Sequence, residues 1–413
     1  MARGAEMARR AGVAVARRQG DCYATRAPRG EPSVDLQPDR LPYGGVAGNA
    51  GPRRTSRPRE RPSHVWYLWQ NWNRQVSIEA TATALRFAVI GAGRLGAGLA
   101  LALRRRGQTL VGFTAASPAG RARAEAWLGL PALPALSDLV RLRPDLYFVC
   151  VPDGAITGVA AELGAELRAG TEAGPSAAAA AGAADPQGGA AAPAARAGPG
   201  VRRAGAAHRP VVAHTSGATS VSALLPCEEA GAATLVFHPL QTFPEPLSGA
   251  TRFAGAGVAL SPGSADPDAA GAMGMKLADI LGMRPFFLAD EKRTLYHAAA
   301  TVACNYVVTL EYLANELFVK AGVPERVTWS LFLPLVRATL ENLAARGPVD
   351  ALTGPLSRGD AATIAAHLEA LASDAPEIVP VYRALGLATL DLVAARHEVD
   401  PEELARLHTL LAE

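Results

Sequence analysis

The chain has 413 residues, of which 49% are hydrophobic and 19% charged, and its formal net charge is +3. This length allows two or three domains with a large apolar core. The basic residues are nearly all arginine and are not concentrated on one element, which argues against a nucleic-acid-binding protein. No apolar run reaches the roughly 18 residues of a membrane-spanning helix, so we expect no membrane association.

Two stretches have a low-complexity composition. Residues 1–83 are rich in arginine, proline, glycine and alanine and show no helical or strand period, which predicts a disordered extension. The start of the chain lacks the apolar segment of a signal peptide, so we expect a cytoplasmic protein. Residues 169–207 are rich in alanine, glycine and proline and predict a surface insertion, because closing a long loop costs little free energy.

The four cysteines lie far apart in the sequence and none has a CxxC spacing. Such spacing indicates neither a zinc site nor a disulfide framework, and we predict no metal site. Cys150 ends an apolar run and Cys304 lies in an apolar helical stretch. Both are expected to be buried free thiols, as is usual in a reducing cytosol.

Strand-like and helical patterns alternate between residues 84 and 289. Short apolar runs predict strands at residues 86–90, 108–114, 145–151, 210–216, 233–239, 256–261 and 284–289. Helical patterns follow the first two strands, at residues 94–107 and 118–129. Strands that alternate with helices form a mostly parallel sheet with helices on both faces, so we predict an α/β domain at residues 84–289.

The pattern becomes entirely helical from residue 290. Amphipathic stretches predict helices at residues 290–322, 324–347, 359–373, 376–397 and 400–412. Pro334 should kink or break the second of these helices, because proline cannot donate the helical hydrogen bond. We therefore predict an all-helical second domain at residues 290–413.

The motif "GAGRLG" (91–96) follows the first strand and opens the first helix, which is the context of a Rossmann-like dinucleotide-binding fold. Its three glycines allow a tight turn, close approach to a pyrophosphate, and close helix–strand packing. The pyrophosphate would lie at the helix N-terminus. A glycine-rich turn without a ligand is the alternative. The predicted cofactor contacts are Gly91, Ala92, Gly93, Arg94, Leu95 and Gly96.

The end of the second strand lacks the acidic residue that usually binds the ribose of NAD. It carries Thr114 and Ser117, followed by Arg121 and Arg123, which favours NADP over NAD. The alternative is that these arginines only solvate a helix face. Further cofactor contacts are predicted after later strands, at Val151, Pro152, Asp153, His214 and Ser216. For Asp153, a plain helix N-terminal residue is the alternative.

Polar residues gather where two later strands end, in "AHTSGA" (213–218) and "FHPLQTF" (237–243). Ligands of open α/β sheets bind at the carboxyl ends of strands, so these residues should share an edge with the glycine loop. The helix predicted at 290–322 adds His297, Thr301 and Asn305, spaced to lie on one face. A satisfied core histidine or a polar helix–helix seam would explain the same residues without catalysis.

Six motifs together resemble a known family: "GAGRLG", "VPDGAI", "HTSGA", "HPLQTF", "YHAAATVACN" and "TGPLSRGD". They resemble bacterial proteins with a Rossmann-like NADP-binding domain and a C-terminal domain of unknown function, of the 6-phosphogluconate dehydrogenase C-terminal type. Pyrroline-5-carboxylate reductase, β-hydroxyacid dehydrogenases and deazaflavin-dependent NADP reductases are more distantly similar. The resemblance covers residues 86–168 and 208–410 and implies a homodimer through the helical domain.

The resemblance also bears on the site. In β-hydroxyacid dehydrogenases a lysine and an asparagine of the long helix carry chemistry, whereas this chain has His297 and Asn305, with Lys292 nearer the helix start. We expect His238 or His297 to act as a general acid, since a histidine with a near-neutral pKa suits that role. The predicted catalytic residues are His238, His297, Asn305, Ser216 and Gln241. The predicted substrate contacts are Gln241, Thr301 and Arg358, although Arg358 could instead pair with Asp360.

The combined pattern favours an NADP-dependent oxidoreductase. It would transfer a hydride to or from a small carbonyl, imine or hydroxyacid held between the two domains. A non-catalytic NADP-binding sensor or scaffold is the alternative from another class. A reductase that uses a flavin or deazaflavin as co-substrate is a third possibility.

Overall fold

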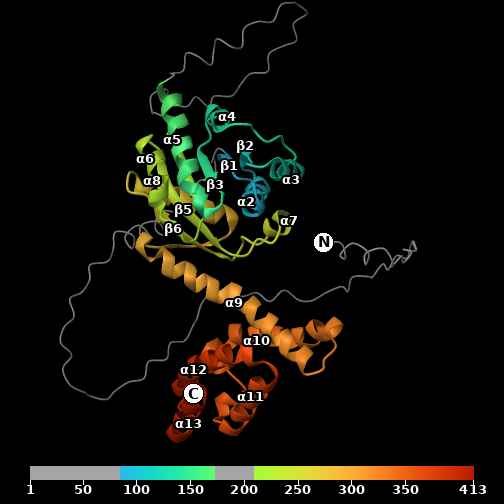
Figure 1. Ribbon diagram of the computed structural model, residues 1–413. Coiled ribbons are helices and arrows are strands. Elements are labelled where there is room, and N and C mark those ends of the chain that lie inside the picture. The colour runs from blue at the N-terminus through green and yellow to red at the C-terminus, as the bar shows by residue number, and fades with distance from the viewer. Residues whose placement is uncertain (1–83, 173–208) are drawn as a thin grey trace, which may run out of the picture. The chain divides into compact units, whose positions relative to one another are not determined.

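The computed structural model describes residues 84–172 and 209–413 (Figure 1). The extension predicted at residues 1–83 lies outside the described residues, as does the predicted insertion from residue 173 onward. Helix α5 (Ile156–Glu172) continues into the first residues of the stretch that was predicted to be the insertion.

All seven predicted strands form one sheet with the order β2-β1-β3-β4-β5-β6-β7. The strands are β1 (Arg86–Ile90), β2 (Thr109–Thr114), β3 (Leu146–Val149), β4 (Val211–His214), β5 (Ala233–Leu240), β6 (Gly257–Pro262) and β7 (Arg284–Phe287). Neighbouring strands pair in parallel, except that β6 runs antiparallel to β5. This mostly parallel sheet confirms the predicted fold class.

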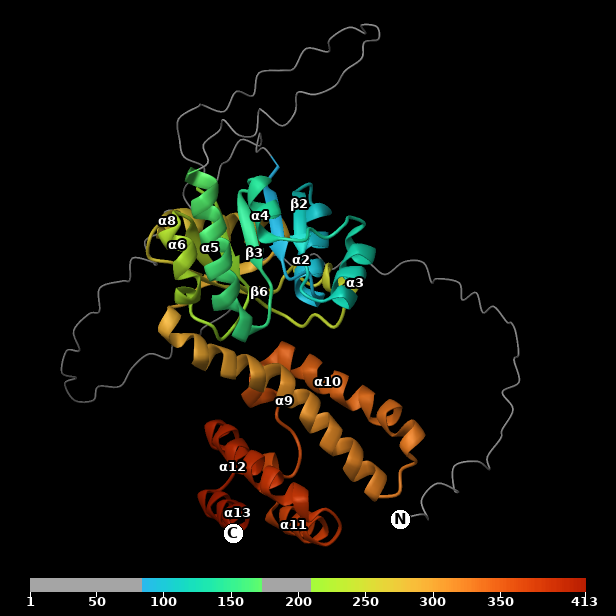
Figure 2. The same ribbon diagram turned by 45° about the horizontal axis from the view of Figure 1, so that its top comes forward.

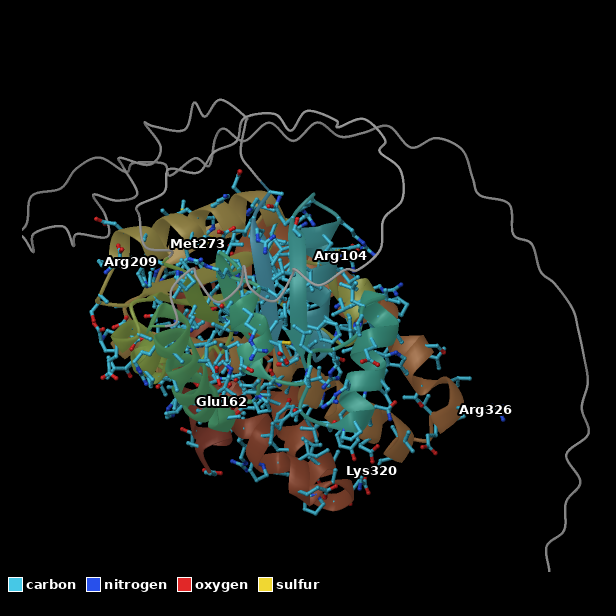
Figure 3. All side chains as sticks on the ribbon, turned by 90° about the horizontal axis from the view of Figure 1, so that it is seen from above. Arg104, Glu162, Arg209, Met273, Lys320 and Arg326 are labelled. Atoms are coloured by element: carbon cyan, nitrogen blue, oxygen red, sulfur yellow. The ribbon has the colours of Figure 1, made fainter. Side chains whose placement is uncertain are left out.

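Helices cover both faces of the sheet (Figure 1). Side chains alternate along β1, so Phe87 and Val89 enter one core while Ala88 and Ile90 enter the other. The first core is shared with α2 (Arg94–Arg104), α3 (Pro118–Leu128) and α8 (Pro267–Leu281). The second is shared with α4 (Leu136–Arg141), α5 and α6 (Leu225–Glu229). The short helix α7 (Pro246–Gly249) packs on α2. Arg104, labelled in Figure 3, ties α2 to the end of α3 by donating to the Leu128 carbonyl.

The C-terminal region is helical, as predicted. A short 3-10 turn, η3 (Asp290–Lys292), leads into α9 (Arg293–Lys320), which runs beside α10 (Glu325–Ala351) (Figure 2). The remaining helices α11 (Ala361–Asp374), α12 (Val379–Arg396) and α13 (Pro401–Ala412) share a small core that includes Ile364, Leu390 and Leu407.

The interruption in α10 falls at Gly347, where the helix predicted at residues 324–347 ends, and not at Pro334, where a kink or break was also predicted. The backbone dihedral angles leave the helical region at Gly347, with a φ of 77°, and not at Pro334. Proline's fixed φ is compatible with a helix, so a ring at this position removes a hydrogen bond without forcing non-helical angles. Glycine alone adopts a positive φ without strain, which explains why the chain breaks at Gly347.

One helical stretch among the described residues, Pro376–Arg396, is long and apolar enough to cross a membrane by length and composition, with a hydropathy of 1.5. Glu377, Arg383 and Asp391 interrupt this stretch, so it is not the uninterrupted apolar run whose absence was predicted. A core helix of a globular protein meets the same criterion, and α12 packs on α13 and α10. It also carries Arg383, whose guanidinium donates to the Leu410 carbonyl. The expected lack of membrane association stays a prediction.

Candidate functional site

A cavity of about 870 Å³ opens at the carboxyl ends of β1, β2 and β3. This volume lies within the range of pockets that hold small molecules and cofactors. The chain reverses its direction across the sheet between β1 and β3, which is where open α/β sheets bind ligands. The predicted cofactor residues that line it are Gly91, Ala92, Gly93, Arg94, Thr114, Ser117, Arg121, Val151 and Pro152.

The three glycines of the loop differ in what surrounds them. A Cβ at Gly91, where φ is +87°, would lie 2.7 Å from the Cys150 carbonyl oxygen. A Cβ at Gly96 would lie 2.6 Å from the Gly91 carbonyl oxygen. A Cβ at Gly93 would meet no described protein atom within 4 Å, and this residue lines the cavity. Protein packing therefore requires glycine at positions 91 and 96, whereas at position 93 it leaves free space for a ligand.

Positive charge lies at the end of the cavity that follows β2. The Arg121 and Arg123 side chains line this end. The Nε of Arg121 is buried and has no hydrogen-bond partner among the described residues. A buried donor without a partner costs free energy, so a bound acceptor at this position would be favoured. Ser117 caps α3 by accepting a hydrogen bond from the Gly120 amide.

Helix α5 also contributes to the lining of the cavity. Glu162, labelled in Figure 3, projects from this helix and lines the cavity. Glu245, the residue before α7, is the other carboxylate in the lining. Neither belongs to the segment that follows β2, so no described carboxylate occupies the place where NAD-binding folds usually contact the ribose.

A polar cluster lies where β4 and β5 meet the start of α9. His238 lies on β5, and its Nδ1 is 2.9 Å from the Tyr296 hydroxyl of α9. The rings of His238 and His297 are 6.3 Å apart. A Cβ at Gly217 would lie 2.8 Å from the His238 Nε2 and 2.6 Å from the His297 Cδ2. Only glycine therefore lets the loop after β4 approach both imidazoles. We call His238, Tyr296, His297 and Gly217 the histidine cluster.

Burial keeps His238 neutral. Desolvation, followed by the charges of Arg293 and His297, lowers the pKa of His238 to about 4. Burial also raises the pKa of Tyr296 above its ordinary value. At neutral pH the Tyr296–His238 pair is thus a hydrogen bond between two neutral groups. The expectation of a near-neutral pKa is not met at His238, because the strand places the ring in a poorly hydrated position.

His214 is held inside the protein by its own loop. The ring is fully buried, its Nδ1 accepts from the Ser216 amide at 3.2 Å, and its Nε2 lies 3.2 Å from the Ser220 carbonyl. Burial lowers the pKa of His214 to about 4. The Ser216 hydroxyl accepts from the amides of Ala218 and Thr219. Both predicted ligand contacts are therefore engaged in shaping the loop at residues 214–221.

Two predicted site residues near these strands lie apart from the cluster rings. Gln241 is exposed, and its Oε1 accepts from the Thr242 amide at 2.8 Å while its amide group contacts the Arg252 carbonyl. Asp153 lies in η1 (Asp153–Ala155) and is exposed, but its charge acts on both His214 and His238. Asp153 is therefore a carboxylate whose charge raises the pKa of both rings against the effect of burial, and Asp290 does the same at His214.

Three predicted residues of the helical region are also apart from the rings. The Thr301 hydroxyl donates to the His297 carbonyl within the helix. Asn305 is exposed and lies eight residues past His297, which is about 12 Å along the helix axis. Arg358 is exposed and ends the half-buried turn η4 (Leu356–Arg358), two residues before Asp360, which caps α11. None of these three side chains is hydrogen-bonded to a ring of the cluster in the described part of the chain.

Sequence reasoning missed Arg293, Asp290, Tyr296 and Gly217 as site residues. Arg293, Tyr296 and His297 are spaced i, i+3 and i+4, so they share one face of α9. That spacing was a usable signal. Arg293 was not predicted because an arginine in the first turn of a helix is usually exposed to solvent.

Comparisons with known proteins agree with this architecture. Residues 73–198 match the family described as "Rossmann-like domain", and residues 264–389 match "Domain of unknown function (DUF2520)". The second match begins before the domain boundary predicted at residue 290. The 6-phosphogluconate dehydrogenase type expected for the C-terminal domain is not part of either description and stays an expectation. No curated protein matches the chain.

Several solved structures are similar to the chain. The structure of a proposed NADP oxidoreductase from Bacteroides fragilis has a TM-score of 0.52 and 23% identity, covering 73% of this chain and 96% of its own. The 1-pyrroline-5-carboxylate reductase of Streptococcus pyogenes has a TM-score of 0.47 and 15% identity, covering 79% and 100%. A Thermotoga maritima protein has a TM-score of 0.43 and 20% identity, covering 79% and 98%. At such identities the first of these supports the fold alone.

Proposed function

We propose that the protein is an NADP-dependent oxidoreductase that transfers a hydride to or from a small carbonyl, imine or hydroxyacid. The observation that carries this proposal is the shared sheet edge of the glycine-lined cavity and the histidine cluster. The cavity lies at β1, β2 and β3, and the cluster lies at the adjacent β4 and β5. The nicotinamide group, when bound, supplies the hydride chemistry.

The residues present fit a dinucleotide with a 2′-phosphate. The open space at Gly93 and the N-terminus of α2 suit a pyrophosphate. The unpartnered Nε of Arg121, together with Arg123, suits a further phosphate. These features support NADP over NAD as the cofactor.

The residues of the histidine cluster would bind and orient the substrate. His238 is held through Nδ1 by Tyr296, so Nε2 is its remaining hydrogen-bonding atom. Because His238 is neutral near pH 7, its Nε2 can donate to or accept from a substrate oxygen or nitrogen. His297, which approaches the same glycine, is the proposed partner for proton transfer.

The cofactor proposal is tested by titrating the protein with NADPH and NADH and following nicotinamide fluorescence. NADPH should bind more tightly than NADH. Replacing Arg121 with glutamine removes a charge-assisted hydrogen bond, so NADPH binding should weaken by about 10- to 100-fold with little change for NADH. Arg105→Gln, an exposed arginine of the turn after α2 that does not line the cavity, is the matched control.

Two outcomes would count against this reading. Equal affinity for both dinucleotides, or an Arg121 variant that binds NADPH normally, would remove the preference for NADP. Absence of binding to either dinucleotide would remove the oxidoreductase proposal altogether. Tight NADPH binding without turnover of any carbonyl, imine or hydroxyacid in a broad panel would instead favour a non-catalytic sensor or scaffold.

We further propose a homodimer formed through the helical region. Of the 28 residues of α9, only Arg293 is buried. Large apolar side chains of α9 and α10 are exposed, among them Val308 at 68% and Leu335 at 65%. Monomeric proteins rarely expose so many large apolar side chains on neighbouring helices, and a second copy offers the same surface for a two-fold contact.

The three free cysteines of the described residues suit a cytoplasmic protein.

A double variant tests the dimer. Val308→Glu with Leu335→Glu should convert a dimer to a monomer in sedimentation velocity, because burying two unpaired carboxylates is strongly unfavourable. Arg326→Glu, at an exposed position of α10 labelled in Figure 3, should leave the dimer intact. A wild-type protein that sediments as a monomer at high concentration would contradict the proposal.

A further inference from the structure

Arg293 is a buried arginine at the start of α9, and its side chain is 1% exposed. A buried guanidinium is costly unless its donors are satisfied. Its Nε donates to the Thr219 carbonyl at 3.0 Å, and its Nη2 donates to the Ser216 carbonyl at 2.8 Å. Its Nη1 donates to the Ser261 hydroxyl at 2.9 Å. Every nitrogen of the guanidinium therefore holds a neighbouring element in place.

Two of these acceptors belong to the loop at residues 214–221, and the third belongs to β6. Ser261 in turn donates to the Leu288 carbonyl. Asp290, three residues before Arg293, accepts from the Val221 amide at 3.0 Å and from the Ser220 hydroxyl. The start of the helical region is thus hydrogen-bonded to the loop at two places. The Arg293 guanidinium binds Ser216 and Thr219, and the Asp290 carboxylate binds Ser220 and Val221.

The hydrogen bonds of Arg293 also determine where the rings of the histidine cluster lie. Arg293 shares one helical face with Tyr296 and His297, so fixing its guanidinium fixes where these two rings lie. The loop that Arg293 binds contains Gly217, against which the rings of His238 and His297 pack. The Arg293 side chain therefore fixes the position of the α9 rings and also that of the loop that packs against them.

The charge of Arg293 also reaches the imidazoles. It is a cause of the lowered pKa of both His214 and His238, second to burial at His238. The other charged or titratable groups that act on His238 are His297, Asp153 and His214. Tyr296 is hydrogen-bonded to it. Loss of the guanidinium should therefore raise the pKa of His238, since a nearby like charge disfavours protonation.

We propose that Arg293 is a positioning residue that sets Tyr296 and His297 against His238 by anchoring the loop at residues 214–221. Its effect on turnover rests on the proposed function, whereas its effect on the cluster does not. Arg293 acts through these neighbours, because its three nitrogens are all engaged by the protein. The opposing interpretation is a core arginine that only stabilises the fold.

The test compares Arg293→Met, Arg293→Lys and wild type by NMR of histidine-labelled protein. The His238 resonance, assigned with a His238→Asn variant, should titrate near pH 4 in the wild type. In Arg293→Met the midpoint should rise by on the order of one pH unit. Arg293→Lys keeps the positive charge but cannot form all three hydrogen bonds, so the midpoint of the His238 titration should stay closer to that of the wild type. Arg326→Met, at an exposed arginine, should change nothing.

A second readout addresses position. NADPH affinity should be unchanged in both Arg293 variants, because Arg293 does not line the cavity. Turnover of the best substrate should fall by about 10- to 100-fold in both, since small displacements of reacting groups have effects of this size. Should Arg293→Met not fold, Ser261→Ala removes one acceptor of the guanidinium and leaves its charge in place. Turnover should then fall by less than in Arg293→Met, and the His238 midpoint should stay near that of the wild type.

The outcomes separate the two proposals. A folded Arg293→Met protein with a wild-type His238 titration and wild-type turnover would overturn the positioning role and leave the proposed function standing. The positioning role would also be overturned if Arg293→Lys or Ser261→Ala only lowered the melting temperature and changed neither the His238 titration nor the turnover. A protein that binds no dinucleotide would end the proposed function, while the His238 titration would still decide the role of Arg293.

Discussion

Replacing Gly93 with aspartate should weaken NADPH binding by at least about 100-fold, or ~2.7 kcal/mol, without destabilising the protein. Gly93 lines the cavity and is the N-cap of α2, with φ and ψ of −75° and −161°. These angles are available to any residue, and aspartate is among the best N-cap residues. A carboxylate there would occupy the space over the glycine loop and repel a pyrophosphate.

The same position separates binding from folding. The free energy of unfolding of Gly93→Asp should be unchanged or rise by up to about 1 kcal/mol, because an N-cap side chain satisfies a helix amide. Gly93→Ser adds the steric bulk without the charge and should weaken binding less. Gly96→Ala should instead destabilise the fold, because its Cβ would lie 2.6 Å from the Gly91 carbonyl oxygen.

A control and a contrary result sharpen this prediction. Gly158→Asp places the same charge at an exposed position in the first turn of α5 that does not line the cavity. It should leave NADPH binding as it is in the wild type. Fluorescence titration gives the affinity, and urea unfolding gives the stability. If Gly93→Asp bound NADPH as tightly as the wild type, this cavity would not be the dinucleotide site.

The strands could be predicted because each is a short apolar run with turn residues on both sides. The direction of β6, which runs antiparallel to β5, could not be predicted. An apolar run has the same pattern whichever way the strand runs in the sheet. Helix α8 was missed because its sequence is rich in alanine, glycine and methionine. Its end signals were nevertheless present, with Asp266 as N-cap and Gly282 in the left-handed region at the C-cap.

The site could be predicted in outline and not in its contacts. The glycine motif located the cavity, since its spacing implies a particular turn. The strand order predicted that His238 lies near the carboxyl ends of the parallel strands, and β5, which runs parallel to β4, places it there. The orientation of Gln241 depends on Thr242 and Arg252, and the burial of His214 depends on how its loop folds back. Such contacts between side chain and loop leave no period in the sequence.

The polar stripe on α9 shows the same limit. His297, Thr301 and Asn305 share a helix face, yet only His297 reaches Gly217. A helix face extends along its axis, whereas a site is local, so spacing alone extends the predicted site too far. The other contacts of the cluster come from residues before His297, namely Tyr296 directly before it and Arg293 one turn earlier. The start of α9 is the part hydrogen-bonded to the strand ends and to the loop after β4.

Replacing His238 with alanine should lower turnover by about 100- to 10,000-fold while NADPH binds as before. His238 carries the hydrogen bond to Tyr296 and is the ring against which Gly217 packs, and it does not line the cofactor cavity. Tyr296→Phe removes only the hydroxyl of that pair, so it should cost up to about tenfold. His408→Ala, an exposed histidine of α13, should have no effect.

The pH dependence gives an independent check on His238. Its pKa in the folded protein is about 4, so the ring is neutral near pH 7 and gains a proton as the pH falls toward 4. If the neutral ring is the active form, turnover should fall over that range in the wild type, and this fall should be absent from the residual rate of His238→Ala. The rates are measured by NADPH absorbance with the best substrate from a panel of small aldehydes, 2-oxo acids and cyclic imines. A His238→Ala variant that retained the full rate would show that the proton-handling group lies elsewhere in the cluster, and His297 would then be the residue to replace.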